Sequence, residues 1–183
     1  MKRLYILRHA KAENPTSGGE DRERALAGKG KQDTRHMRDL LHKEVWGNGS
    51  PPDLVLCSDA RRTRETWEIL RSGPDFSPKS NPDRTLHMSF EKDLYLADLS
   101  TLTRRIRRTE DTTQALLLIG HNPGLQDLVL QLTTGTISPA RAQVAESFPT
   151  AAFAALHFPI TTWKNICTTP AELAYLLTPA SRS

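Results

Sequence analysis

Apolar residues in this chain fall into short continuous runs, separated by longer stretches in which they recur at helical spacing. The continuous runs lie at 4–7, 53–57 and 116–120, and runs of this kind are typical of strands that are buried on both faces of a sheet. We therefore expect the first run to lie centrally in a sheet. Two further strands are expected at 85–90 and 150–158.

Between these runs, the apolar spacing predicts amphipathic helices. The pattern is clearest after the third run, where four residues fall on one helical face: Leu125, Leu128, Val129 and Leu132. Further helices are expected after Gly30, at 60–70 and at 96–108, and residues 138–149 are expected to form a surface loop. Strands that alternate with helices predict an α/β fold, with a largely parallel sheet covered by helices on both faces.

The composition is that of a soluble, folded protein. The chain has 183 residues, of which 25% are charged and 37% are hydrophobic, so we expect a single domain over residues 1–183. No apolar stretch is long enough to cross a membrane. Cys57 and Cys167 lie far apart and form neither a zinc-ligand spacing nor a disulfide framework, which favours a reduced, cytoplasmic protein without a metal or other cofactor.

The formal net charge of +4 favours anionic ligands, and both phosphate compounds and nucleic acids meet that condition. The most basic stretch is "RRIRR" at 104–108. Aromatic residues do not interleave with its arginines, as they do in many nucleic-acid surfaces, so a solvated helix face is the better interpretation. We expect neither a nucleic acid nor a membrane as a partner.

Polar residues follow each of the three buried runs. Arg8 and His9 follow the first run, the second leads into Arg61 and Arg62, and His121 follows the third. In open parallel sheets, ligands bind outside the carboxyl ends of the strands. We therefore expect these side chains to converge at one edge of the sheet.

Arginines and histidines that converge in this way suit a phosphoryl group. The planar guanidinium fork binds two phosphate oxygens and neutralises their charge. One imidazole can act as a nucleophile and form a covalent phosphohistidine, and a second, if protonated, can donate to an oxygen that gains charge in the transition state. Phosphoryl transfer depends mainly on positioning and electrostatics, so such a pocket can work without a metal ion. A single Arg-His pair at the end of a strand more often has a structural role as a cap. The presence of a second set, Arg61 or Arg62 together with His121, favours catalysis.

Three segments, "LYILRHAKAE", "CSDARRTRETWE" and "LLLIGHNPGL", resemble in order and spacing the histidine phosphatase superfamily, which has the phosphoglycerate mutase-like fold. Within it, "RHAKA", "EDRERALAGKGK" and "SDARRTRET" are most similar to the SixA-type phosphohistidine phosphatases. The resemblance covers residues 4–132 and, more faintly, 150–158. It implies a three-layer α/β/α architecture around a mostly parallel central sheet.

The resemblance also implies a role for individual residues. His9 would be the phosphorylated nucleophile, and Arg8 would bind the phosphate beside it. His121 would be the second catalytic histidine, and Arg62 takes the place of the family's second arginine, a place that the register gives to it rather than to its neighbour at position 61. Arg24 lies in a stretch near the family's pocket and is a further candidate for substrate binding.

The glutamate that donates a proton in larger members of the superfamily has no obvious counterpart. The stretch "SFEKDLYLAD" offers Glu91 and Asp93, of which Asp93 is the nearer match. If neither acts, the enzyme should prefer leaving groups that need little protonation, and phosphohistidine, with its labile P–N bond, fits better than an alkyl phosphate. The chain lacks long insertions that would build a cap over the pocket.

These features indicate a metal-independent phosphatase that removes phosphate from phosphohistidine on a protein, for which a histidine phosphotransfer protein is a plausible partner. Two alternatives stay open. One is a phosphatase of the same superfamily that acts on small-molecule phosphomonoesters. The other is a noncatalytic module that binds a phosphorylated ligand.

Overall fold

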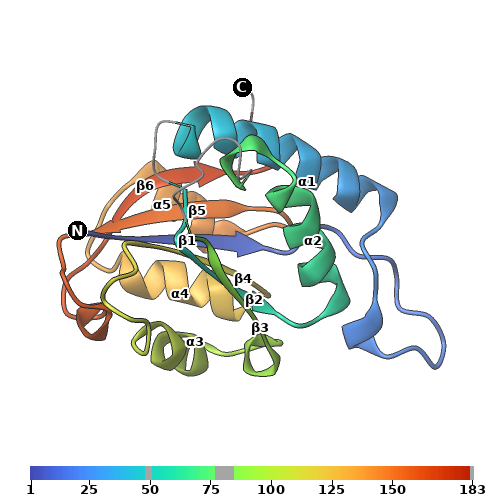
Figure 1. Ribbon diagram of the computed structural model, residues 1–183, viewed down its shortest axis with the longest axis horizontal. Coiled ribbons are helices and arrows are strands. Elements are labelled where there is room, and N and C mark those ends of the chain that lie inside the picture. The colour runs from blue at the N-terminus through green and yellow to red at the C-terminus, as the bar shows by residue number, and fades with distance from the viewer. Residues whose placement is uncertain (48–50, 77–84, 182–183) are drawn as a thin grey trace.

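The computed structural model describes residues 1–47, 51–76 and 85–181 of the chain. Within them, the strands form one sheet in the order β3-β2-β4-β1-β5-β6 (Figure 1). The first four in this order pair in parallel, and β5 and β6 are antiparallel to their neighbours. The strand bounds are β1 Lys2–Arg8, β2 Leu54–Ser58, β3 His87–Glu91, β4 Ala115–Gly120, β5 Phe153–Phe158 and β6 Glu172–Leu177. The expected α/β fold with a mostly parallel sheet is confirmed.

Strand β1 lies in the middle of this sheet, between β4 and β5. Leu4, Tyr5 and Ile6 are completely buried. This burial on both faces explains why the first apolar run is continuous instead of alternating with polar residues. Arg8, the last residue of β1, lies opposite Gly120, the last residue of β4, so both strands deliver the residues that follow them to the same edge.

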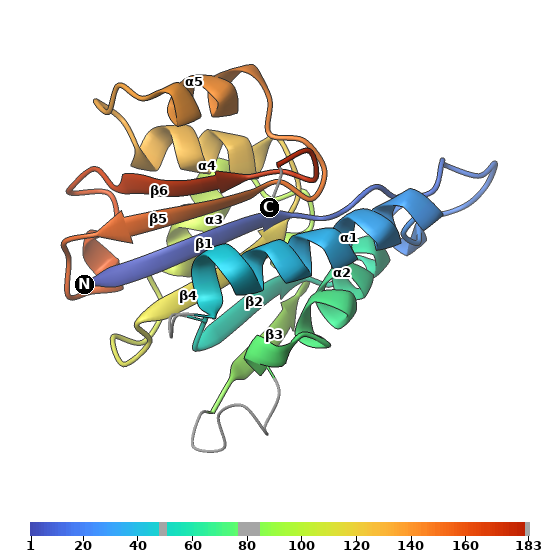
Figure 2. The same ribbon diagram turned by 90° about the horizontal axis from the view of Figure 1, so that it is seen from above.

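Helices cover both faces of the sheet, as Figure 2 shows. Helices α1 and α2 lie on one face, and α3, α4 and α5 lie on the other. Their bounds are α1 Gly28–Leu41, α2 Arg61–Arg71, α3 Leu99–Ile106, α4 Gly124–Leu132 and α5 Pro139–Glu146. None of the helices in the described part of the chain combines the length and the apolar character needed to span a bilayer.

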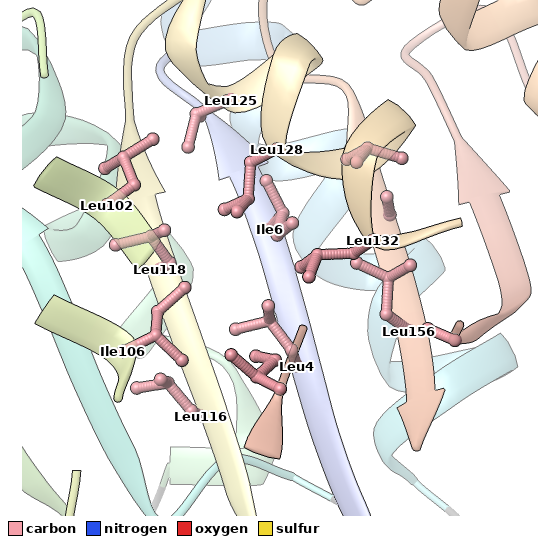
Figure 3. Close-up of a cluster of buried hydrophobic side chains, with 14 of the residues drawn as sticks. Leu4, Ile6, Leu102, Ile106, Leu116, Leu118, Leu125, Leu128, Leu132 and Leu156 are labelled. Atoms are coloured by element: carbon pink, nitrogen blue, oxygen red, sulfur yellow. The ribbon is translucent and has the colours of Figure 1, made fainter. Parts of the chain in front are cut away.

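Alternate residues of the central strands contribute to two separate cores. Leu4 and Ile6 of β1 point toward the α3–α4 side, whereas Tyr5 and Leu7 belong to the cluster under α1 and α2. Figure 3 shows the first of these cores, in which strand leucines meet the apolar faces of α3 and α4. The side chains labelled there include Leu102 and Ile106, the two buried residues of α3.

The expected surface loop at 138–149 is wrong, because this segment contains helix α5. The Ser138 side chain accepts a hydrogen bond from the Arg141 backbone N–H, and Pro139 occupies the first turn. Both are ordinary signals of a helix start. Only Val144 of this helix is buried, so the apolar pattern does not reveal it. Strand β6 at the edge of the sheet is also absent from the sequence-based prediction.

Between β1 and α1 the chain makes a long excursion beyond the carboxyl edge of the sheet, visible as the blue loop at the right of Figure 2. We call residues 12–26 the excursion loop. Its two ends are held together by a β-bridge between Ala12 and Leu26, and it contains a 3-10 turn, η1, at Asp21–Glu23. The Leu26 N–H also donates to Glu65 of α2, which ties the loop to that helix.

Candidate active site

The carboxyl ends of β1, β2 and β4 bring two histidines and an arginine together. His9 follows β1 directly, His121 follows β4 directly, and Arg62 lies in the first turn of α2, which follows β2. The His9 N–H donates to the Gly120 carbonyl at 3.1 Å. The centroids of the two imidazole rings lie 5.0 Å apart. The structure therefore gathers residues that are more than fifty positions apart in the sequence.

The His9 ring is held in one tautomer. Its Nδ1 lies 2.7 Å from the Ala10 carbonyl oxygen, and because a carbonyl only accepts, Nδ1 carries the proton. The lone pair is therefore on Nε2, which accepts from Nε of Arg62 at 3.3 Å. Burial, followed by the positive charge of Arg62, lowers the pKa of His9 to about 4. Near neutral pH this imidazole is uncharged, and the electron pair of its Nε2 faces Arg62.

Arg62 is almost completely buried and uses two edges of its guanidinium group. The side edge, Nε and Nη2, faces Nε2 of His9 at 3.3 Å and Nδ1 of His121 at 3.4 Å. The end edge, Nη1 and Nη2, donates to the backbone oxygen of Asp21 at 2.6 Å and to its Oδ2 at 3.0 Å. Its neighbour Arg61 turns outward and pairs with Glu65 instead, which agrees with the register argument for Arg62.

His121 is buried against Ser58, whose Oγ lies 2.8 Å from Nε2 of the ring. Burial and the neighbouring His9 and Arg62 lower the pKa of His121 to about 3, so the ring is neutral near pH 7. His121 can donate to a phosphoryl oxygen from its protonated form, but burial and the neighbouring positive charges of the protein disfavour that form. A phosphoryl dianion beside the ring would act in the opposite direction and raise its pKa.

Arg8 directly precedes His9 at the carboxyl end of β1. Its Nη1 donates to the Phe148 carbonyl at 2.9 Å, and the same carbonyl accepts from Nδ2 of Asn122. Its Nε is buried and has no hydrogen-bond partner among the described residues. A buried guanidinium N–H of this kind is a donor that an anionic ligand can satisfy.

Asp21 and Tyr95 join the site, although the sequence analysis assigned them no role. Oδ2 of Asp21 accepts from Arg62 and, at 2.6 Å, from the Tyr95 hydroxyl, while Oδ1 accepts from Nη1 of Arg24 at 2.8 Å. Hydrogen bonds from Tyr95 and Arg24 hold the pKa of Asp21 far below its usual range, so it is ionised. Arg24 thus reaches the site through Asp21, and its other nitrogens bond to the carbonyl of Glu13.

No hydrogen bond or ion pair between described residues joins the two candidate proton donors to this cluster. Asp93 is exposed on the short helix η4, Lys92–Leu94, and makes no hydrogen bond or ion pair with any residue that the structure describes. Glu91 is held by Nε and Nη2 of Arg105, each at 2.7 Å. Within residues 1–47, 51–76 and 85–181, neither carboxylate contacts the two histidines or Arg62.

No protein-family model matches this chain. Among curated proteins, it is similar to the uncharacterized protein Rv1276c of Mycobacterium tuberculosis (strain H37Rv), with 32% identity over 154 residues, which cover 82% of this chain and 85% of that protein. A protein of Mycobacterium leprae, ML1117, is 29% identical over 179 residues, which cover 94% of this chain and 99% of that protein.

Solved structures resemble this one over nearly its whole length. A protein from Nakamurella multipartitia, assigned as the phosphohistidine phosphatase SixA, superposes with a TM-score of 0.77 at 20% identity and covers 98% of this chain and 97% of its own. The protein histidine phosphatase SixA complexed with tungstate gives a TM-score of 0.70 at 20% identity, with 97% of both chains covered. The alpha-ribazole phosphatase from Shigella flexneri gives 0.61 at 16% identity, with 99% and 98% covered.

Proposed function

This chain belongs to one family with Rv1276c and has the fold of the histidine phosphatase superfamily, and from that premise we propose that it is a phosphatase that works through a phosphohistidine intermediate on His9. The observation that carries the proposal is the state of the His9 imidazole. Its Nδ1–H is fixed on the Ala10 carbonyl, and its Nε2 lone pair faces the guanidinium of Arg62. A neutral imidazole in this tautomer is ready to attack phosphorus.

In the first proposed step, Nε2 of His9 attacks the phosphorus atom of the substrate. A bond from Nε2 to phosphorus forms, and the bond to the leaving group breaks with its electron pair departing on that group. The side edge of Arg62 and the buried Nε of Arg8 bind the phosphoryl oxygens. We propose that His121 donates to a third oxygen once the bound dianion has raised its pKa.

In the second step, water attacks the phosphorus atom of phospho-His9. The P–N bond breaks and the electron pair returns to Nε2. Inorganic phosphate leaves as H2PO4−, which carries both hydrogens of the water and can release one of them to solvent. Two guanidinium groups supply the positive charge that the transferring group needs, so we propose that the reaction proceeds without a metal ion.

For the substrate, we propose phosphohistidine on a protein, such as a histidine phosphotransfer protein. Breaking its P–N bond demands little from a proton donor. The positions of the carboxylates support this choice, since Asp93 is exposed without a partner in the described structure and Glu91 is engaged by Arg105. The likeness in fold to SixA structures supports it as well.

A second candidate is the hydrolysis of small-molecule phosphomonoesters, because the alpha-ribazole phosphatase also resembles this structure, with a TM-score of 0.61. The role of Asp93 distinguishes the two. If the natural substrates are esters and Asp93 protonates the leaving alcohol, Asp93→Asn should slow the hydrolysis of alkyl phosphates. On the proposed function, the same variant hydrolyses protein phosphohistidine at the wild-type rate.

The test compares the purified protein with its His9→Ala variant on a phosphohistidine-bearing protein and on a chromogenic phosphate, in the presence of EDTA. We expect many turnovers, label from the substrate on His9 after rapid acid-free quenching, and loss of both in His9→Ala. His87→Ala, which removes an exposed histidine of β3, is the matched control and should keep full activity. Unchanged turnover in His9→Ala contradicts the proposal. Stoichiometric phosphate binding without turnover would indicate a noncatalytic binding module.

A further inference from the structure

The carboxylate of Asp21 meets three donors from three separate segments of the chain. Arg62 of α2 and the Tyr95 hydroxyl both donate to Oδ2, and Arg24 of the excursion loop donates to Oδ1. Asp21 is not itself buried, since 46% of its side-chain surface is exposed. An exposed carboxylate that makes a single ion pair contributes little, but one that is fixed by several geometrically matched donors can hold its partners in place.

The contacts divide the guanidinium of Arg62 into a held edge and a working edge. The end edge is satisfied entirely by one residue, because Nη1 donates to the backbone oxygen of Asp21 and Nη2 donates to its carboxylate. The side edge is left with Nε–H and the second hydrogen of Nη2, which point at Nε2 of His9 and Nδ1 of His121. These two hydrogens face the space between the imidazoles, where a phosphoryl group must sit to react with His9.

The Tyr95 hydroxyl holds the same carboxylate oxygen as Arg62. It donates to Oδ2 of Asp21 at 2.6 Å, and its ring packs edge-on against His121 with centroids 5.4 Å apart. The guanidinium of Arg22 lies over the same ring, 4.6 Å from its centroid. Asp21 therefore cannot shift without disturbing a ring that also packs on the second histidine.

We propose that Asp21 is a positioning residue that clamps the end edge of Arg62, with Tyr95 holding the clamp, so that the side edge of Arg62 is aimed at the phosphoryl group. This inference rests on the proposed function for the identity of the reacting group. The orientation of Arg62 toward a bound oxyanion does not itself depend on catalytic turnover.

The geometry argues against the simpler idea that Asp21 only competes with phosphate for Arg62. A competitor would occupy the side edge, between the two histidines. Asp21 instead occupies the end edge and leaves the side edge facing the rings. The two ideas predict opposite signs, since removing a competing negative charge strengthens anion binding, whereas releasing a clamped guanidinium weakens it.

The experiment measures the affinity of the purified full chain for inorganic phosphate by calorimetry, together with kcat and KM. For Asp21→Ala we expect phosphate binding to weaken about tenfold, although a negative charge has been removed, and kcat/KM to fall by about 10- to 100-fold, mostly through kcat. Tyr95→Phe, which leaves net charge unchanged, should act in the same direction by a few-fold. The double variant should be no worse than Asp21→Ala, because both changes release one unit.

Glu23→Ala is the matched control. Glu23 lies in the same turn, and its removal changes the net charge equally, but its side chain makes no hydrogen bond or ion pair with the residues that the structure describes. Phosphate affinity in this control should stay within twofold of wild type. Phosphate binding that is unchanged or tighter in Asp21→Ala overturns the proposal. Should that variant fail to fold, the phosphate affinity of Tyr95→Phe decides.

The outcomes also separate this inference from the proposed function. If the wild-type protein binds phosphate but never turns over a substrate, the proposed function fails. Weaker phosphate binding in Asp21→Ala would in that case still support the clamp.

Discussion

At the scale of single residues, the site depends on which nitrogen of each histidine carries a proton. The Ala10 carbonyl fixes the answer for His9, and Ser58 and Arg62 flank the two nitrogens of His121. Among the described residues, no carboxylate forms a hydrogen bond with either ring that would favour its charged form. Both histidines are consequently neutral in the folded protein, where burial and neighbouring arginines oppose their protonation. Acid conditions should therefore lower the stability of the fold.

The stability of the fold should therefore decrease below neutral pH. The pKa of His9 is about 4 and that of His121 about 3 in the folded protein, against 6.5 as the ordinary value. Between these pH values the unfolded chain binds protons that the folded chain does not. The contribution of the two neutral histidines to the free energy of unfolding is therefore fully present above about pH 6.5 and is lost as the pH falls toward 4. We expect each histidine to lower the free energy of unfolding by about 2 kcal/mol between pH 7 and pH 5, and the two together by about 4 kcal/mol.

Thermal or urea denaturation at pH 7, 6 and 5 measures this loss. In a variant with both His9→Ala and His121→Ala, the decrease over the same pH range should be clearly smaller. An equal decrease in the variant and the wild type would contradict the assignment of these two histidines as the source. The comparison stops at pH 5, so that the titration of carboxylates adds little.

The residues of the site differ in how far the sequence could predict them. Arg8, His9 and His121 lie directly at strand ends, where the apolar run and the rule for parallel sheets together place them. Asp21 and Tyr95 follow no such rule. They enter from the excursion loop and from the residues after η4, and only the three-dimensional path of those segments brings them to Arg62.

At the scale of elements, apolar periodicity predicted the elements that bury a full face, and it missed α5 and β6, which do not. Strand β4 is buried at every position, and α4 buries one complete stripe, so both were predicted. Helix α5 buries only Val144, and β6 is an edge strand whose residues are half-buried or exposed. For such elements the apolar pattern carries little information, and α5 could have been found only from its start signals.

The side-chain cap at the start of α5 should make a measurable contribution to the free energy of unfolding. The Ser138 side chain caps α5 by accepting from the Arg141 N–H at 3.1 Å. Replacing Ser138 with Ala should lower the free energy of unfolding by about 1 kcal/mol. Urea denaturation measures this change, and Ser100→Ala, at an exposed position inside α3, is the control that should change the free energy by less than about 0.5 kcal/mol. A cap variant as stable as the control would contradict the interpretation.

At the scale of the whole molecule, one sheet separates two cores, and both are needed to bury β1. Trp46 lies in the core under α1 and α2, and Trp163 lies in the core on the other face. Both indoles are almost completely buried. Because Leu4, Tyr5 and Ile6 contribute alternately to the two cores, we propose that residues 1–183 fold as a single domain in which neither core is stable alone.

Two variants that each keep a single tryptophan test this proposal. One retains only Trp46 and the other only Trp163, with Phe at the remaining tryptophan positions. In each variant, the fluorescence transition in urea should coincide with the loss of helix measured by circular dichroism. If the Trp46 signal and the helix signal separate, the two faces unfold independently and the single-domain proposal is wrong.

The hydrogen bonds of Arg8 have a consequence for how the protein is made. Its backbone N–H donates to Ala152 and its guanidinium donates to Phe148, which lies 140 positions later in the chain. While the ribosome is still producing the middle of the protein, the residues after β1 have already emerged, yet their partners before β5 have not been synthesised. The arrangement of side chains around His9 can therefore be completed only near the end of translation, and a nascent chain that stops before residue 148 should carry His9, the proposed nucleophile, without the carbonyl that holds Arg8.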